Sequence, residues 1–255
     1  MLAPLEWRIV LTCEHGGRRV PREHRRLFVQ AQRELATHRG YDIGALELAR
    51  ELSRRLAAPL IASTTTRLLV DLNRSAVNPA AFSRWTRGLD SRAKSALLRR
   101  HHAPHRRAVF DAIECALPVI HVAVHSFTPE LRGRTRRTDF GLLFDPGRPR
   151  ERAFCSAWRA VIAERASAVR VDFNQPYRGW TDGLPTSLRQ RWTASRYVGV
   201  ELEVNQRLAA DPRARARAAA LLAETLEAVR SSIGRGSTLA GQRGRRGIQR
   251  GTAAQ

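Results

Sequence analysis

The feature that most constrains this chain is the repeated alternation of short apolar runs with longer stretches of helical periodicity. Strand-like runs fall at 7–12, 60–62, 67–72, 119–126, 140–144, 169–173 and 197–204. Helical spacing predicts helices over 42–56, 91–117, 151–166 and 211–233, and a further helix after a loop at Pro21. Alternating strands and helices predict an α/β fold whose mixed or parallel sheet is covered on both faces.

Length and composition indicate one domain with a short appendage. The chain has 255 residues and 43% hydrophobic content, which suffices for one sizeable core over 1–233. Residues 234–255 are rich in Gly, Arg and Gln and lack acidic residues, so we predict a disordered basic tail. No apolar run is long enough to span a membrane, and the N-terminus lacks the layout of a signal peptide. We therefore expect a cytoplasmic protein.

The strongly basic composition is weak evidence for nucleic-acid binding, despite the size of the net charge. The net charge is +22, but Lys94 is the only lysine, and arginine with abundant alanine is what a coding bias produces. Aromatic residues are sparse and do not alternate with the basic ones, as a base-stacking surface needs. We expect non-specific attraction to anions at most. The three cysteines are odd in number and lack CxxC spacing, which argues against disulfides and thiolate zinc clusters: Cys13, Cys115 and Cys155.

Metal-capable side chains follow three of the predicted strands. The first strand runs into Glu14 and His15, and the strand at 119–126 carries His125. The last strand carries Glu201 and Glu203, which point to one face because strand side chains alternate. Ligands of such folds gather at the carboxyl ends of the strands. Two histidines and a carboxylate are typical of a catalytic zinc, and Asp42, at a predicted helix start, is a candidate oxygen ligand.

Each of these features also has a structural interpretation. His121 shares the face of His125, so it is either the ligand in place of His125 or a core residue. The two glycines after His15 are compatible with a simple turn, and the two glutamates with solvated edge charges. His101 and His105 have the spacing of a helical zinc pair, but the glutamate of an HExxH motif is absent and Pro104 interrupts the helix. We therefore interpret the histidines at 101, 102 and 105 as surface or pocket-rim residues.

An arginine-containing segment marks a second candidate site. The run RLLVDLNR places Arg67, Asp71, Asn73 and Arg74 around one predicted strand end. Arg74 is able to bind a substrate carboxylate with two parallel hydrogen bonds. The alternative is an internal ion pair between Asp71 and an arginine. The turn-rich loop 174–183, with Tyr177 and Trp180, predicts a pocket wall or lid.

Taken together, the ordered motifs resemble the N-formylglutamate amidohydrolase family. The resemblance covers roughly 8–208 and rests on six segments: CEHGG at Cys13, HRGYDIGALELA from His38, RLLVDLNR from Arg67, HVAVHSF from His121, NQPYRG from Asn174 and GVELEVNQ from Gly199. It implies a three-layer α/β/α hydrolase fold related to zinc exopeptidases, with a mixed, mostly parallel sheet. It also implies hydrolysis of an N-acyl amino acid, such as N-formylglutamate, as part of amino-acid metabolism.

The same resemblance implies roles for individual residues. Zinc ligands fall on His15, Asp42 and His125, and the catalytic glutamate on Glu203, with Glu201 as the second candidate. Arg74 takes the substrate carboxylate. With the loop and segment residues considered above, the other expected substrate-binding residues are Arg67, Asn73, His38 and Tyr177. The specificity loops, 132–140 and 176–188, contain nothing that singles out glutamate. A cell-wall or peptide amidase with the same metal site, and a non-catalytic nucleic-acid-binding protein, remain alternatives, and the protein is expected to be a monomer or homodimer.

Overall fold

The centre of the molecule is a six-stranded sheet. The structure, a computed structural model, describes residues 6–243. The strands lie in the order β2-β1-β3-β8-β6-β7. Their bounds are β1 Arg8–Cys13, β2 Leu60–Ala62, β3 Val119–Phe127, β6 Phe140–Leu143, β7 Val171–Phe173 and β8 Tyr197–Asn205. Six of the seven predicted strand-like runs therefore form this sheet.

The sheet is mostly parallel, with one reversal of direction. β1 pairs in parallel with both β2 and β3, and β3 pairs in parallel with β8. β6 runs antiparallel to β8, and β7 follows β6 in parallel. The carboxyl ends of β1, β3 and β8 consequently meet at one edge, which is where the predicted metal-capable side chains lie.

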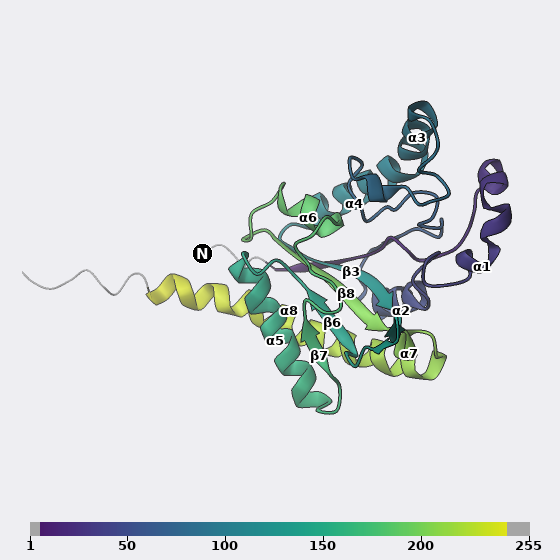
Figure 1. Cartoon of the computed structure of the whole chain (residues 1–255). Helices are drawn as coiled ribbons and strands as arrows, with labels where there is room; N and C mark the ends of the chain where they lie inside the picture. The colour runs from purple at the N-terminus through teal and green to yellow at the C-terminus, as the bar shows by residue number, and fades with distance from the viewer. Residues whose placement is uncertain (1–5, 244–255) are drawn as a thin grey trace, which may run out of the picture.

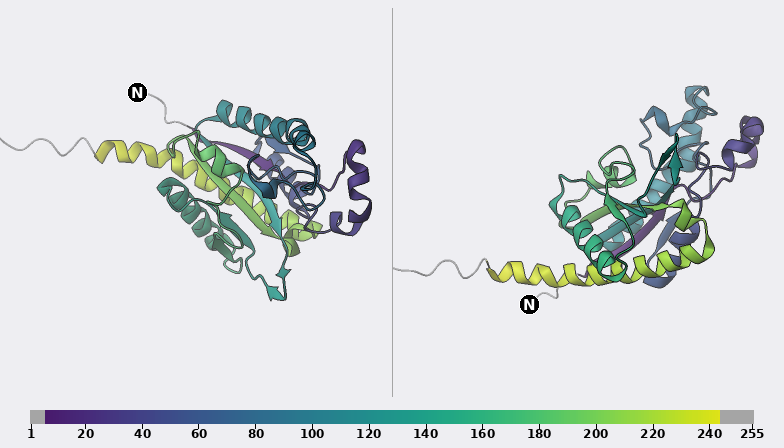
Figure 2. Two further views of the ribbon diagram at one scale, coloured as in Figure 1. Left: turned by 45° about the horizontal axis from the view of Figure 1, so that its top comes forward. Right: turned by 60° about the horizontal axis from the view of Figure 1, so that its bottom comes forward.

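Helices cover both faces of the sheet, which confirms the three-layer α/β/α prediction (Figure 1; Figure 2). One face carries the main hydrophobic core beneath α2 (Ala45–Leu56), α5 (Pro149–Arg165) and α8 (Pro212–Arg243), where α8 contacts both other helices. The opposite face packs against α4 (Ala103–Ala116) and α6 (Leu184–Arg189) through a smaller apolar cluster.

A separate arm of short helices extends beyond the sheet, near the α1 and α3 labels of Figure 1. It is built from the 3₁₀ helix η1 and α1, and from α3 with the π-helical turn η3. Their bounds are η1 Arg22–Ala31, α1 Gln32–Leu35, α3 Ser91–Leu97 and η3 Leu98–His102. The arm has its own apolar cluster, formed by Phe28, Ala31, Leu35, Leu68, Leu69 and Leu97. The remaining elements are η2 Pro79–Ala81, α7 Gln206–Ala209 and a small hairpin of β4 Glu130–Leu131 and β5 Arg134–Thr135.

Two predicted elements differ from the structure. Residues 67–72 are not a strand but a series of turns, because Leu68 and Leu69 are buried in the apolar cluster of the arm instead of the sheet. The helix expected from Asp42 begins at Ala45, since Gly44 has a φ of +79° and packs against the backbone of Ala209. A side chain at Gly44 would place its Cβ only 2.1 Å from that carbonyl oxygen.

The C-terminal helix runs past the predicted end of the domain. α8 extends to Arg243, so residues 234–243 of the predicted tail are helical, and the remainder of that tail, 244–255, lies outside the described residues. Across 6–243, no helix combines the length and apolar character that a membrane crossing requires.

Candidate metal centre and active site

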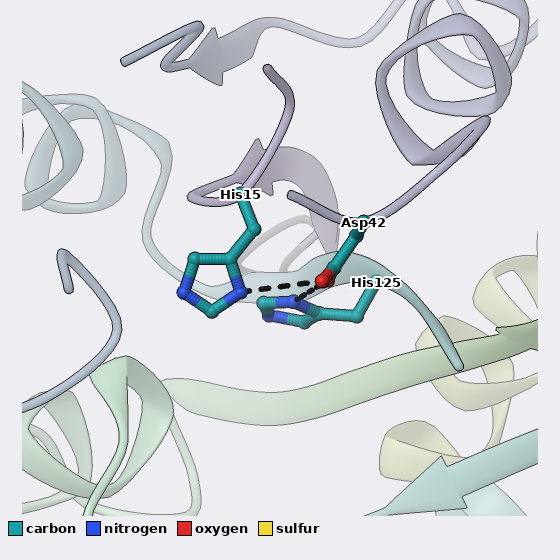
Figure 3. Close-up of side chains that lie close together, drawn as sticks. All are labelled: His15, Asp42 and His125. Atoms are coloured by element: carbon teal, nitrogen blue, oxygen red, sulfur yellow. Dashed lines mark hydrogen bonds and ion pairs between the residues drawn. The ribbon is translucent and has the colours of Figure 1, made fainter. Parts of the chain in front are cut away.

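His15, Asp42 and His125 converge on one buried point at the edge of the sheet (Figure 3). The Nδ1 atoms of His125 and His15 lie 2.8 and 3.4 Å from the same Asp42 carboxylate oxygen. One ligand atom from each residue lies within 4.8 Å of the others. The backbone contributes directly, because the Asp42 N–H donates to the His15 carbonyl at 2.9 Å. The structure therefore brings together the three side chains that the sequence analysis named as candidate metal ligands.

The second nitrogen of each histidine faces another buried carboxylate. His15 Nε2 lies 2.7 Å from Asp71 Oδ1, and His125 Nε2 lies 3.2 Å from Glu14 Oε2. Proteins orient metal-binding histidines in this way, with one ring nitrogen toward the metal and the other toward a carboxylate. Asp71 and Glu14 thereby fix the Nε2 side of each ring, so that both Nδ1 atoms point toward Asp42.

These outer carboxylates are themselves held in place. Asp71 accepts a hydrogen bond from Arg67 at 2.8 Å and one from the backbone of Asn73 at 3.0 Å. Glu14 is completely buried and also lies 3.5 Å from His105 Nε2. Burial opposes ionisation of Glu14, but hydrogen bonds from His105 and His125 hold its pKa well below the usual range. Burial likewise opposes ionisation of Asp71, and Arg67 and His15 lower its pKa.

The charge of this cluster fits a divalent cation. Burial opposes protonation of His15 and His125, but the neighbouring carboxylates raise the pKa of both. Metal coordination needs neutral imidazoles. In that state the carboxylates of Glu14, Asp42 and Asp71 and the guanidinium of Arg67 leave two negative charges for a cation to balance. Buried charge is costly unless it is paired. His15 Nδ1 is also buried without a hydrogen-bond partner among the described residues. Donor types, charge and the unpartnered nitrogen therefore all suit a metal ion.

The glycines after His15 are needed for close packing. A Cβ on Gly17 would lie 2.5 Å from the Thr64 carbonyl oxygen, and one on Gly16 would lie 2.8 Å from that of Ser63. The chain that follows β1 thus passes directly against the chain that follows β2. This contact leaves no room for a side chain at Gly16 or Gly17, so the two glycines do more than form a turn.

Glu203 and Glu201 lie beside this cluster in different environments. Glu203 is the β8 partner of His125, is buried, and its Oε2 lacks a hydrogen-bond partner within residues 6–243. Burial, reinforced by the charges of Asp42 and Glu201, raises its pKa to about 8, although His125 acts in the opposite direction. Glu201 is half-buried and accepts a hydrogen bond from Asn73 at 3.0 Å. Of the two, only Glu203 has a buried oxygen without a partner among the described residues.

A cavity of about 550 Å³ opens onto the cluster. All ten predicted site residues line it: His15, His38, Asp42, Arg67, Asn73, Arg74, His125, Tyr177, Glu201 and Glu203. Lining residues that the sequence interpretation did not single out include Arg39, Arg178, Thr181 and Asp182. The loop 174–183 therefore forms part of the pocket wall, as predicted.

The arginines of the pocket have distinct partners. Arg67 forms the ion pair with Asp71 that was the alternative interpretation of this segment, and it approaches Asp42 at 3.5 Å. Arg74 instead donates from Nη1 to the Asp182 carbonyl at 2.6 Å. The Asp182 carboxylate is occupied by the backbone N–H of Ser75. Arg74 is thus held by only one end of its guanidinium.

Other histidines have structural positions. His121 lies in the core, 2.9 Å from Thr12 Oγ1 and 2.7 Å from the Tyr197 hydroxyl, and burial lowers its pKa to about 4. It does not belong to the group of possible metal ligands formed by His15, Asp42 and His125. Of the histidines interpreted as surface or pocket-rim residues, His102 is buried and bonds the carbonyl of the pocket residue Arg74 at 2.8 Å, so it is not on the surface. The His105 side chain is also largely buried, beside Glu14.

Comparison with known proteins relates this arrangement to amide hydrolysis. A family model described as N-formylglutamate amidohydrolase matches residues 7–210. No curated protein matches the chain. A gene product of Agrobacterium tumefaciens has a similar structure, with a TM-score of 0.77 and 28% identity over 89% of this chain and 92% of that one. An N-formylglutamate amidohydrolase from Ralstonia eutropha has a TM-score of 0.65 and 19% identity over 92% and 97% of the two chains.

Proposed function

This chain belongs to the N-formylglutamate amidohydrolase family, and we propose that it is a zinc-dependent enzyme that hydrolyses a small N-acyl amino acid. N-formylglutamate is the first substrate to consider. The observation that carries the proposal is the buried group of His15, Asp42 and His125 beneath a pocket lined by arginines. Each histidine in that group is backed by a carboxylate.

In this proposal, His15 Nδ1, Asp42 and His125 Nδ1 hold the metal. Two histidines, one carboxylate and an open fourth position are usual for catalytic zinc. When bound there, the ion would polarise the substrate carbonyl and lower the pKa of a water molecule. Asp71 and Glu14 keep the two imidazoles oriented throughout the reaction.

Glu203 moves the proton. In its ionised form it accepts a proton from the attacking water as the water oxygen bonds to the carbonyl carbon, and it delivers that proton to the nitrogen as the C–N bond breaks. The products are a carboxylate and a free amino acid. Its unpartnered oxygen at the level of His125 supports this assignment. Glu201 is committed to Asn73, so its proposed part is to position that amide.

Arg74 is the proposed partner of the substrate carboxylate. Its guanidinium is fixed by Asp182 at one end, which leaves donors for a bidentate contact. Arg67, Asn73, His38 and Tyr177 line the same cavity and complete the substrate site. Its volume of about 550 Å³ lies within the range of small-molecule pockets.

Metal analysis followed by a substrate panel tests this function. Protein stripped with a chelator should regain turnover of an N-acyl amino acid when zinc is restored. Glu203→Gln should keep the catalytic metal and lower kcat by about 10²- to 10⁴-fold, the usual contribution of a positioned acid–base group. Glu201→Gln is the matched control and should lose less. If Glu203→Gln turns over at the parent rate, Glu203 has no part in proton transfer. Release of amino acids only from peptidoglycan fragments would replace the small substrate by a cell-wall one.

A further inference from the structure

A second group of metal-capable side chains lies in the arm. Glu23 and His24 belong to η1, and His101 belongs to the π-helical turn η3. These three residues are absent from the described lining of the catalytic pocket. We propose that Glu23, His24 and His101 bind one divalent transition-metal ion, which joins η1 to the π-helical turn.

The geometry brings three donors together from two distant segments. One ligand atom of each residue lies within 4.8 Å of the others. The two imidazole rings are 5.8 Å apart between centroids and nearly perpendicular, at 71°. The two rings are therefore not stacked, and their nitrogens remain close enough to share one ion.

Two of the donor atoms have no other partner among the described residues. The Nε2 atoms of His24 and His101 are inaccessible to solvent and have no hydrogen-bond partner among residues 6–243. Most buried polar atoms in folded proteins have a partner, and leaving one unpartnered costs free energy. Two such nitrogens from neighbouring imidazoles, beside a carboxylate, are what a bound cation would satisfy together.

The donor set selects the class of metal. Imidazole nitrogen suits Zn²⁺, Ni²⁺, Co²⁺ or Cu²⁺, whereas Ca²⁺ and Mg²⁺ prefer sites made of oxygen. Two arginines oppose a cation here. Arg100 is largely exposed and lies 3.9 Å from Glu23, and the charge of Arg19 also reaches His101. An exposed charge of this kind is well screened by water.

The location suggests what the ion would stabilise. His102, the next residue of the same π-helical turn, bonds the Arg74 carbonyl at 2.8 Å. The turn therefore contacts η1 through His101 and the catalytic pocket through His102. A metal ion in this position would fix η1 against the turn that supports the segment carrying Arg74.

Zinc titration of chelator-treated protein tests the proposal without reference to activity. The parent should bind two equivalents per chain, and His101→Ala and His24→Ala should each bind one. Their affinity for the second ion should fall by more than about 100-fold, since losing even an outer-shell partner typically costs 10- to 100-fold. Arg99→Ala, on the same turn, is the control and should bind two. Zinc should also raise the Tm of the parent more than that of His101→Ala.

Two further variants separate this site from the catalytic one. Asp42→Ala should still bind one equivalent, at Glu23, His24 and His101, even if the proposed catalytic metal proves wrong. Glu23 is exposed, so Glu23→Gln should preserve the fold and weaken the arm site alone. Equal zinc binding by the parent, His101→Ala and His24→Ala would overturn the proposal. So would a second equivalent that binds the parent only at millimolar zinc.

Discussion

The two clusters that contain paired histidines use the same kinds of donor in opposite surroundings. His15, Asp42 and His125 are all buried, whereas Glu23 is exposed and His24 and His101 are half-buried. The histidines of the first cluster have Asp71 and Glu14 behind them. In the described part of the chain, no carboxylate forms an ion pair with the imidazoles of His24 and His101, and Glu23 lies instead 3.9 Å from Arg100.

The comparison shows that having suitable donor atoms is different from having them held in the orientation that a metal needs. Outer carboxylates fix the ring orientation and raise the basicity of a ligating imidazole, so the first cluster is organised before an ion arrives. The second cluster relies on backbone placement alone. We therefore expect tight, persistent binding in the pocket, and weaker, exchangeable binding in the arm.

The largest expected effect follows from removing the carboxylate shared by both pocket histidines. Asp42→Ala should abolish metal retention in the pocket and reduce turnover to background, because the ion would keep only two protein ligands. The matched change in the arm, Glu23→Ala, should leave kcat unchanged. Metal content and kcat of the two purified variants measure the contrast. Full turnover by folded, metal-free Asp42→Ala would contradict the proposed centre.

An intermediate effect is expected from the residues behind the histidines. Asp71→Asn and Glu14→Gln keep the side-chain shape but weaken the support of His15 and His125, so each should weaken zinc binding in the pocket by about 10- to 100-fold. Competition with a chromogenic chelator measures this affinity. Asp111→Asn is the control and should bind zinc like the parent, because Asp111 is a half-exposed carboxylate on α4 that pairs with Arg107. Parent-like affinity in both test variants would remove the distinction drawn between the clusters.

The smallest effect concerns the backbone beside His15. Gly17→Ala should lower the free energy of unfolding by about 1–3 kcal/mol, because the added Cβ would overlap the backbone of Thr64. Gly88→Ala is the matched control, since a Cβ there meets no atom within 4 Å. Urea denaturation of both variants measures the difference. Equal stability of the two variants would show that the chain after β1 can move to make room for the added Cβ. Close packing of this chain would then not be what positions His15.

Most of the pocket was predictable from the sequence because strand ends carry information about position. His15 and His125 follow or end apolar runs of β-branched residues, and parallel strands bring such ends to one edge. The ordered motifs then added Asp42 and Glu203. The sequence did not reveal that Asp71 backs His15, because 67–72 has the apolar character of a strand. Its leucines are buried by a different cluster, which depends on contacts with η1 and α3.

The histidines of 101–105 show why local spacing was insufficient. The i, i+4 spacing of His101 and His105 places two imidazoles side by side only in a regular α-helix, and the chain is π-helical over 98–102. His105 consequently lies beside Glu14, and His101 lies beside His24, far away in sequence. A periodicity argument contains no information about such an irregular turn or about partners supplied by a distant segment.

The π-helical turn also makes this region sensitive to chain length. A π turn accommodates one residue more than the surrounding α-helix. Deleting a residue between Leu98 and His102 would restore uniform α-helical phase and rotate α3 relative to α4 by about 100°, the angle of one residue. A deletion there would separate His101 from His24 or His102 from Arg74, whereas substitutions leave the phase intact. Natural relatives with this helix one residue shorter would therefore need another way to support the Arg74 segment.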